Sequence, residues 1–221
     1  MRYRNSPQAQ KYAKRTKNIF NYTIAFVCIS IFSMSLNFMM LFNSVFINVT
    51  DLSTHYSWAY SFSKGISAGY ILPRWSADSN LGLGEPTFYY YAPLTYYMCA
   101  LINVLFDNIW NSLRITLITS NIIAGLVTFC HVYNKSVFRG LVGAFAIQAS
   151  PMFFMVLSFN AAFAWAFALP FYVLVFILYA RQPLQKIISP ALAVVYAMVC
   201  LSHILSGLMI GLSLAMSESP S

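Results

Sequence analysis

The sequence predicts an all-α fold: a polytopic transmembrane helical bundle with an amphipathic outer-face loop between its first and second apolar segments. Of its 221 residues, 59% are hydrophobic and only 8% are charged. Ordinary soluble domains are ~45–50% apolar, so lipid is the expected solvent for this chain. Most of the hydrophobic residues lie in long runs that short polar connections separate.

The formal charge of +8 is concentrated at the N-terminus. Six basic residues precede the first apolar run: Arg2, Arg4, Lys11, Lys14, Arg15 and Lys17. A basic lead before a long apolar run is typical of a cytoplasmic N-terminus, so residues 1–18 are assigned to the cytoplasm and nucleic acid is not an expected partner. The run is too long for the ~7–15-residue core of a cleaved signal peptide, which favours an uncleaved anchor.

Residues 19–215 are expected to form the transmembrane domain. Its spans are predicted at residues 21–46, 115–132, 141–157, 162–179 and 187–215. The last segment is long enough to tilt, or to break in two near Ser206. The apolar piece at 93–106 is shorter than the ~20 residues of a span, so it is predicted to be re-entrant or interfacial, with a full crossing as the alternative.

The basic connections predict the topology. Two connections carry positive charge, the first with Lys135 and Arg139 and the second with Arg181 and Lys186. The positive-inside rule places both in the cytoplasm, which requires an even number of crossings between Lys17 and Lys135. The spans at 21–46 and 115–132 supply two. This topology puts the loop at 47–92 outside and His203 near the same outer surface.

The first outer loop concentrates the polar chemistry of the chain. Residues 50–97 contain three of the five acidic residues, one of the three histidines, a lysine and an arginine: Asp51, Asp78, Glu85, His55, Lys64 and Arg74. Asp51 and His55 stand four apart, so in a helix they share one face. Such a pair could bind a divalent metal ion or transfer a proton. Alternatively, the Asp51 carboxylate caps the helix.

Other residues suggest ligand contacts. Arg74 follows Pro73, which ends the helical stretch, and its planar guanidinium suits either phosphate or lipid head groups. His203 lies in an apolar run, where an ionisable side chain indicates function; the alternative is a neutral histidine bonded to Ser206 or to a carbonyl. Gly82 and Gly84 predict a tight turn, because no helix start or Lys-Ser/Thr pair follows them.

Together these motifs resemble a known family. An Asp after the first span and a His four residues on are followed by G-x-x-x-P-R-W and by N-x-G-x-G-x-P-x-F-Y-x-Y-x-P-L-x-Y-Y. This order resembles GT-C-type membrane glycosyltransferases, and most closely the group labelled "6-pyruvoyl-tetrahydropterin synthase related". The matching residues are Asp51, His55, Pro73, Arg74, Trp75, Asn80, Gly82, Gly84, Pro86, Phe88, Tyr89, Tyr91, Pro93, Leu94, Tyr96 and Tyr97. Residues 150–170 and 201–206 are similar to later motifs of the family.

The resemblance implies a polytopic enzyme of a bacterial or archaeal cytoplasmic membrane. It would transfer a sugar from a polyprenyl-phosphate donor to an acceptor on the outer face, with membrane lipid and lipid-linked sugar as its partners. Asp51 would act as general base or, with His55, hold a divalent metal ion near the donor phosphate. Arg74, His55 and His203 would contact the substrate and its phosphate.

The chain also departs from the family pattern. The second outer loop, around residues 159–165, carries no charge where the family has an arginine and an acid. The polar tail at 216–221 follows about six apolar segments, fewer than the family typically has, so a truncated or split member is expected. Two other functions therefore stay open: a non-catalytic membrane protein that binds lipid or a protein partner, and a transporter or flippase of a lipid-linked substrate.

Overall fold

The computed structural model describes residues 7–37, 51–150, 163–181 and 189–217. In these residues every regular element is a helix, and one isolated antiparallel bridge joins Ser76 to Glu85. The all-α prediction is therefore confirmed for the described part of the chain. The longer helices are α1 (Pro7–Leu36), α3 (Leu52–Ser67), α5 (Leu94–Phe106), α6 (Ile109–Val132), α7 (Val137–Gln148), α10 (Leu169–Ala180), α11 (Pro190–Ser202) and α12 (Ile204–Ser217). Short helices lie in the connections: η2 (Asn80–Gly82), α4 (Thr87–Tyr90) and α9 (Phe163–Phe167).

Within the described ranges, two helical stretches are long and apolar enough to cross a membrane, Gln10–Leu36 in α1 and Ile109–Val132 in α6. The other apolar helices, α5, α7, α10, α11 and α12, have 12–14 residues. At 1.5 Å per residue each is about 20 Å long, whereas the hydrocarbon core is about 30 Å thick. The three later spans predicted from hydropathy are therefore not single long helices in this part of the chain.

The first two predicted spans begin earlier than expected. α1 begins at Pro7, so the described part of the basic lead is helical rather than a separate tail. The lead is rich in Lys, Arg, Gln and Ala, which are strong helix formers, and proline is favoured in the first turn. α6 begins at Ile109 because the Asn108 side chain accepts a hydrogen bond from the Asn111 N–H at 3.0 Å. Residues 38–46 of the first predicted span lie outside the described residues.

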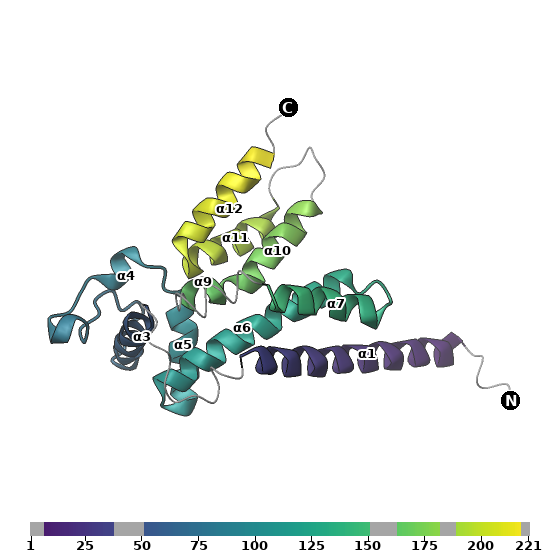
Figure 1. Cartoon of the computed structure of the whole chain (residues 1–221), viewed down its shortest axis with the longest axis horizontal. Helices are drawn as coiled ribbons and strands as arrows, with labels where there is room; N and C mark the ends of the chain where they lie inside the picture. Colours follow the sequence, from purple (N-terminus) through teal and green to yellow (C-terminus); the bar gives the residue numbers. More distant parts are fainter. Residues whose placement is uncertain (1–6, 38–50, 151–162, 182–188, 218–221) are drawn as a thin grey trace.

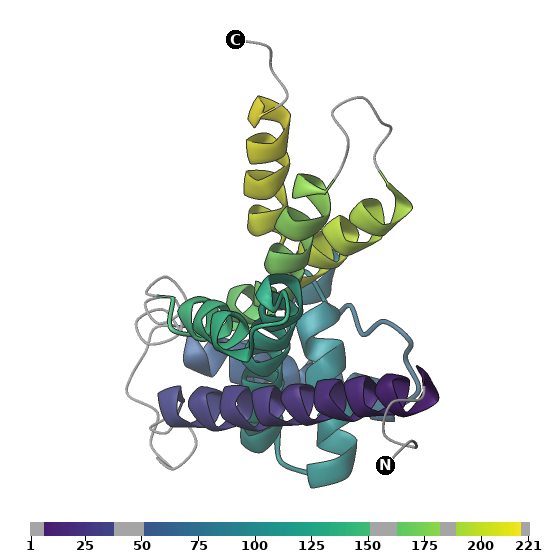
Figure 2. The same ribbon diagram turned by 90° about the vertical axis from the view of Figure 1, so that its right-hand side faces the viewer.

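The last predicted span is broken into a helical hairpin. The break falls at His203, three residues before the predicted position, where the backbone is extended (φ −154°, ψ 108°). The His203 imidazole accepts the Ser206 N–H at 3.3 Å and so caps the first turn of α12. The Tyr196 hydroxyl of α11 donates to the Gly207 carbonyl of α12 at 2.8 Å, which shows that the two helices fold back on each other. Figures 1 and 2 show this pair rising beside α10, apart from α1.

α1, α6 and α7 pack around a buried polar group. Asn121 of α6 accepts a hydrogen bond from the Ser33 hydroxyl of α1 at 2.8 Å and another from the Gln148 amide of α7 at 3.2 Å. Gln148 also donates to the Ile29 carbonyl at 3.2 Å. Gly125 lies against both Gln148 and Ile29, and a Cβ there would come within 2.9 Å of each side chain. Polar side chains and small residues are the usual means by which helices associate in lipid.

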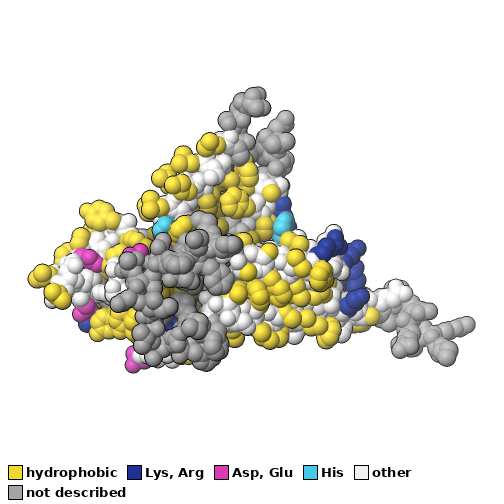
Figure 3. Space-filling view, viewed as in Figure 1, with side chains coloured by type: hydrophobic (Ala, Val, Ile, Leu, Met, Phe, Trp, Pro, Cys, Tyr) yellow, Lys and Arg dark blue, Asp and Glu magenta, His cyan; other side chains and the backbone are white. Residues whose placement is uncertain are grey.

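The same contacts establish that α1 and α6 are antiparallel. Asn21, near the start of the apolar part of α1, bonds to Tyr133 just after α6, whereas Ser33 bonds to Asn121 in its middle. Figure 3 shows most Lys and Arg side chains at the end of the molecule where α1 begins, and Asp and Glu side chains toward the opposite end. The basic lead and the connection after α6 therefore share one side, as the predicted pair of crossings requires.

Candidate functional site

Helix α3 places Asp51 and His55 at one end of a buried core. His55, Ala59 and Phe62 recur at helical spacing and are 3%, 0% and 0% exposed. Asp51 occupies the N-cap position and its carbonyl accepts the His55 N–H at 3.0 Å. Its carboxylate makes no capping hydrogen bond, and the residue is exposed. Asp51 therefore presents a carboxylate at the start of α3.

The His55 imidazole is enclosed by aromatic rings. The rings of Trp58, Tyr91, Tyr96 and Phe163 lie 5.6–6.2 Å from it, centroid to centroid. Its Nδ1 is 2.6 Å from the Tyr96 hydroxyl. Burial, with a smaller contribution from His203, lowers the pKa of His55 from 6.5 to about 4. At neutral pH the ring is therefore uncharged, so in its expected phosphate contact it would act as a hydrogen-bonding group and not as a cation.

We expect the stability of the protein to fall as the pH decreases from about 6.5 to about 4. In that range the unfolded chain binds a proton at His55 that the folded protein resists, because the folded pKa is the lower one. The shift corresponds to a loss on the order of 3 kcal/mol. Thermal unfolding in detergent at a series of pH values measures it. His55→Phe should make the unfolding temperature less dependent on pH, whereas His131→Phe should leave its pH dependence unchanged. If the unfolding temperature of His55→Phe varies with pH as much as that of the wild type, another group is responsible.

His203 sits at the turn between α11 and α12. Its Nδ1 is 2.7 Å from the Ser206 hydroxyl, and its ring stacks on Trp165 of α9 at 5.9 Å and 8°. The bond to Ser206 is the one predicted for a structural histidine. The ring nevertheless also lines a cavity of about 590 Å³ between α9, α10 and α12. The cavity walls are mainly apolar, and the Tyr172 hydroxyl, close to Ser206, makes no hydrogen bond among the described residues.

The fold brings three of the predicted site residues into one region. Helix α9 packs Phe163 against His55 and stacks Trp165 on His203, and the two imidazoles are close enough to interact electrostatically. Tyr91 packs edge-on against His55. Burial, and then the nearby Asp51 carboxylate, raise the pKa of Tyr91 to about 12. Asp51 and His55 are thus both near Tyr91, and α9 links His55 to His203 through Phe163 and Trp165.

Arg74 has a different environment. Its guanidinium lies 5.3 Å from the centre of the Tyr89 ring, and its carbonyl accepts the Phe88 N–H at 3.1 Å. The side chain is exposed. The cation therefore packs on the aromatic segment at α4, where its charge is accessible to a ligand.

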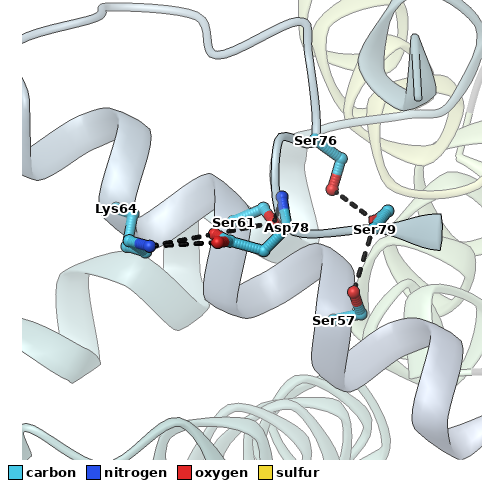
Figure 4. Close-up of polar contacts among 6 residues, drawn as sticks. All are labelled: Ser57, Ser61, Lys64, Ser76, Asp78 and Ser79. Atoms are coloured by element: carbon cyan, nitrogen blue, oxygen red, sulfur yellow. Dashed lines mark hydrogen bonds and ion pairs between the residues drawn. The ribbon is translucent and has the colours of Figure 1, made fainter. Parts of the chain in front are cut away.

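The loop that carries Arg74 is fastened to α3 by side-chain bonds. Figure 4 shows Lys64 and Ser61 of α3 facing Asp78 of the loop, and Ser57 facing Ser79. Lys64 Nζ lies 3.1 Å from each carboxylate oxygen of Asp78. The hydroxyl oxygens of Ser57 and Ser79 are 3.2 Å apart. These contacts hold the loop in one position along α3.

Glu85 anchors the return of the loop. Its carboxylate accepts hydrogen bonds from the Trp58 indole, from the Thr87 hydroxyl at 2.9 Å and from the Asn80 amide at 3.4 Å. Burial by itself raises the pKa of Glu85, but the hydrogen bonds from Thr87, Trp58, Ser79 and Asn80 outweigh it and the pKa is lowered. Glu85 is thus ionised and structural, a role that the sequence alone did not indicate.

The glycine pair forms the predicted turn. Gly82 and Gly84 have φ of 87° and 75°, values that side chains disfavour. Gly84 also gives room to the Trp75 indole, because a Cβ there would lie 2.4 Å from its nitrogen. The prediction of a tight turn at this position is confirmed.

Two expected features lack a complete structural counterpart. The described residues contain no group of three His, Cys, Asp or Glu side chains that could hold a metal ion. The uncharged second outer loop at 159–161 lies outside the described residues.

Sequence reasoning also missed Tyr96, Phe163 and Trp165, the aromatic partners of the two histidines. Tyr96 belongs to the P-L-x-Y-Y motif, but the motif does not indicate that its hydroxyl contacts His55.

Comparison with known proteins identifies the family. The model of the 6-pyruvoyl-tetrahydropterin synthase related domain, described as a membrane protein, matches residues 88–217. His203 lies within the match, whereas Asp51, His55 and Arg74 precede it. No curated protein and no solved structure matches the chain. Because the match covers more than half of its residues, the chain belongs to the 6-pyruvoyl-tetrahydropterin synthase related family of membrane proteins.

Proposed function

We propose that this protein is a GT-C-like glycosyltransferase that moves a sugar from a polyprenyl-phosphate-linked donor to an acceptor on the outer face of the membrane. The observation that carries the proposal is an apolar cavity lined by His203, whose imidazole is near that of His55, four residues from the exposed Asp51 carboxylate. An apolar cavity with a histidine in its wall suits a reaction whose leaving group is a phosphate on a lipid chain.

The cavity has the composition expected for the donor lipid. Its walls are aliphatic and aromatic, and its polar groups are concentrated at Ser150, His203, Ser206 and Tyr172. An isoprenoid chain would fill the apolar part, and its phosphate would lie at the His203 end. His203 would donate a hydrogen bond to a phosphate oxygen. Arg74 packs on Tyr89 and does not line the cavity, so this step does not use it.

The proposed step is a displacement at the anomeric carbon. The acceptor hydroxyl attacks that carbon and gives its proton to the Asp51 carboxylate. The bond between the anomeric carbon and the phosphate oxygen breaks, and its electron pair leaves with polyprenyl phosphate. The pair of Asp51 and His55 fits a shared metal ion poorly, because the His55 ring is buried and its Nδ1 bonds to Tyr96. The step therefore uses the carboxylate as a base alone.

The proposed orientation places the N-terminus in the cytoplasm of a bacterium or archaeon. The basic residues at the end of the molecule where α1 begins support it. The loop that follows Asp51 then faces outward, where the lipid-linked donor is consumed.

The test is a deletion strain with a complete profile of its glycolipids and glycoconjugates. We expect one sugar modification to disappear, the lipid-linked donor to accumulate on the outer leaflet, and the wild-type gene to restore the modification. Accumulation on the inner leaflet would favour the flippase instead. An unchanged profile would contradict both and favour a non-catalytic, lipid- or partner-binding protein.

A further inference from the structure

The first outer loop ends in a tip that exposes two leucines. Leu81 is fully exposed, with a relative accessibility of 105%, and Leu83 is 83% exposed. Leu81 is also in the left-handed region, at φ 58° and ψ 31°, and Asn80 before it has φ 51°. Leucine is disfavoured in this conformation, whereas asparagine and glycine adopt it readily. Leu81 therefore gains nothing from packing within the described structure, and its backbone conformation disfavours leucine.

The exposure of these leucines is built into the fold. The N–H groups of Gly82 and Gly84 donate to the Ser79 carbonyl at 3.1 and 2.9 Å. Below the tip, Ser76 and Glu85 exchange two backbone hydrogen bonds at 2.8 and 3.1 Å. Ser79 in turn bonds to Ser57 of α3. A loop fixed at so many points presents its tip in one conformation.

The surroundings of the tip have the composition of a membrane interface. The exposed side chains of the same loop are mostly aromatic or apolar: Tyr70, Ile71, Trp75, Tyr89 and Tyr90. The two carboxylates nearest the tip are occupied, Asp78 by Lys64 and Glu85 by Trp58 and Thr87. Hydrophobic side chains are visible at this end of the molecule in Figure 3. Tyr and Trp concentrate where lipid head groups meet acyl chains, and an unpaired carboxylate would be unfavourable there.

We propose that the tip formed by Leu81, Gly82 and Leu83 inserts into the lipid–water interface of the membrane in which the protein resides. The bilayer is the occupant that these observations favour, because a leucine pair flanked by Tyr and Trp and free of unpaired acids suits lipid. The tip then fixes the depth of the first loop relative to the bilayer. This inference is independent of the proposed glycosyl transfer.

Tryptophan substitution with lipid quenchers tests the proposal. Leu81→Trp and Leu83→Trp are reconstituted in nanodiscs of phosphatidylcholine with either ordinary or dibrominated acyl chains, and the emission of the parent protein is subtracted. We expect bromine to reduce the added emission at least about twofold. Ala77→Trp, exposed on the same loop beside Asp78, is the control and should change little. Equal added emission in the two lipids at positions 81 and 83 would overturn the proposal, and a protein partner would then be the better occupant.

A second variant separates lipid contact from a role in folding. Leu81→Asn with Leu83→Asn places a residue that tolerates positive φ at the strained position and removes both apolar side chains. In detergent the thermal unfolding temperature should be unchanged or higher. A decrease of several degrees would show that the leucines serve the fold, and would contradict the proposal even if the tryptophan variants were quenched.

Discussion

Asp51→Asn is expected to lower sugar transfer by about 10²–10⁴-fold while leaving the stability of the protein unchanged. Asparagine keeps the size of the side chain but cannot take the proton of the acceptor hydroxyl. The Asp51 carboxylate makes no capping hydrogen bond and is exposed, so its removal costs α3 no capping bond. Asparagine is also a good N-cap residue, which protects the start of α3.

The measurement is transfer to the glycoconjugate in the complemented deletion strain, together with thermal unfolding of the purified variant. Asp107→Asn is the matched control. Asp107 lies in the left-handed turn between α5 and α6, at φ 46°, a conformation that asparagine accepts as well. Its transfer should equal that of the wild type. Full transfer by Asp51→Asn would remove the assignment of Asp51 as base.

Gly140→Ala is expected to destabilise the protein by about 1–3 kcal/mol. A Cβ at Gly140 would come within 2.5 and 2.6 Å of two ring carbons of Phe129, and Phe129 is completely buried between α1, α6 and α7. The added methyl group can fit only if α7 moves away from α6. That movement would also loosen the buried bonds of Gln148.

Gly143→Ala, one turn further along α7, is the control. Its Cβ would be 3.3 Å from the nearest atom, a methyl group of Val132, so a shift of a few tenths of an ångström suffices. Because alanine is a better helix former than glycine by about 0.5–1 kcal/mol, this variant should match or exceed the wild type. Thermal unfolding in detergent measures the stabilities of Gly140→Ala, Gly143→Ala and the wild type. Equal stabilities of the two variants would mean that the contact between α6 and α7 is less tight than described.

Residues with strong local backbone preferences allowed part of the first loop to be predicted. The turn at Gly82 follows from the backbone preference of glycine, and the start of α3 after Asp51 was predicted, although the Asp51 carboxylate makes no capping bond. The end of α3 was placed too late: the helix ends at Ser67, shortly before Gly69 at φ 91°, and not at Pro73. The break at His203 was harder to place. Hydropathy is uniform through the segment, and the break depends on an imidazole that caps the next helix and on a glycine that lets α11 and α12 approach.

The candidate site was only partly predictable for a related reason. Asp51, His55 and His203 attract attention because ionisable groups are rare in this chain. Their aromatic partners Tyr96 and Trp165 do not, since buried aromatic residues are abundant and their contacts depend on tertiary packing. The neutral state of His55 follows from that packing too, and no spacing rule contains it.

The shared amide of Asn121 also constrains how the molecule assembles. Ser33 of α1 and Gln148 of α7 both donate to the same oxygen, so the contact is complete only when three helices are present and in one register. A slide of α1 along α6 by one turn would separate Ser33 from Asn121 by about 5 Å. During membrane insertion the pair of α1 and α6 can therefore form first, and the arrival of α7 then fixes its register.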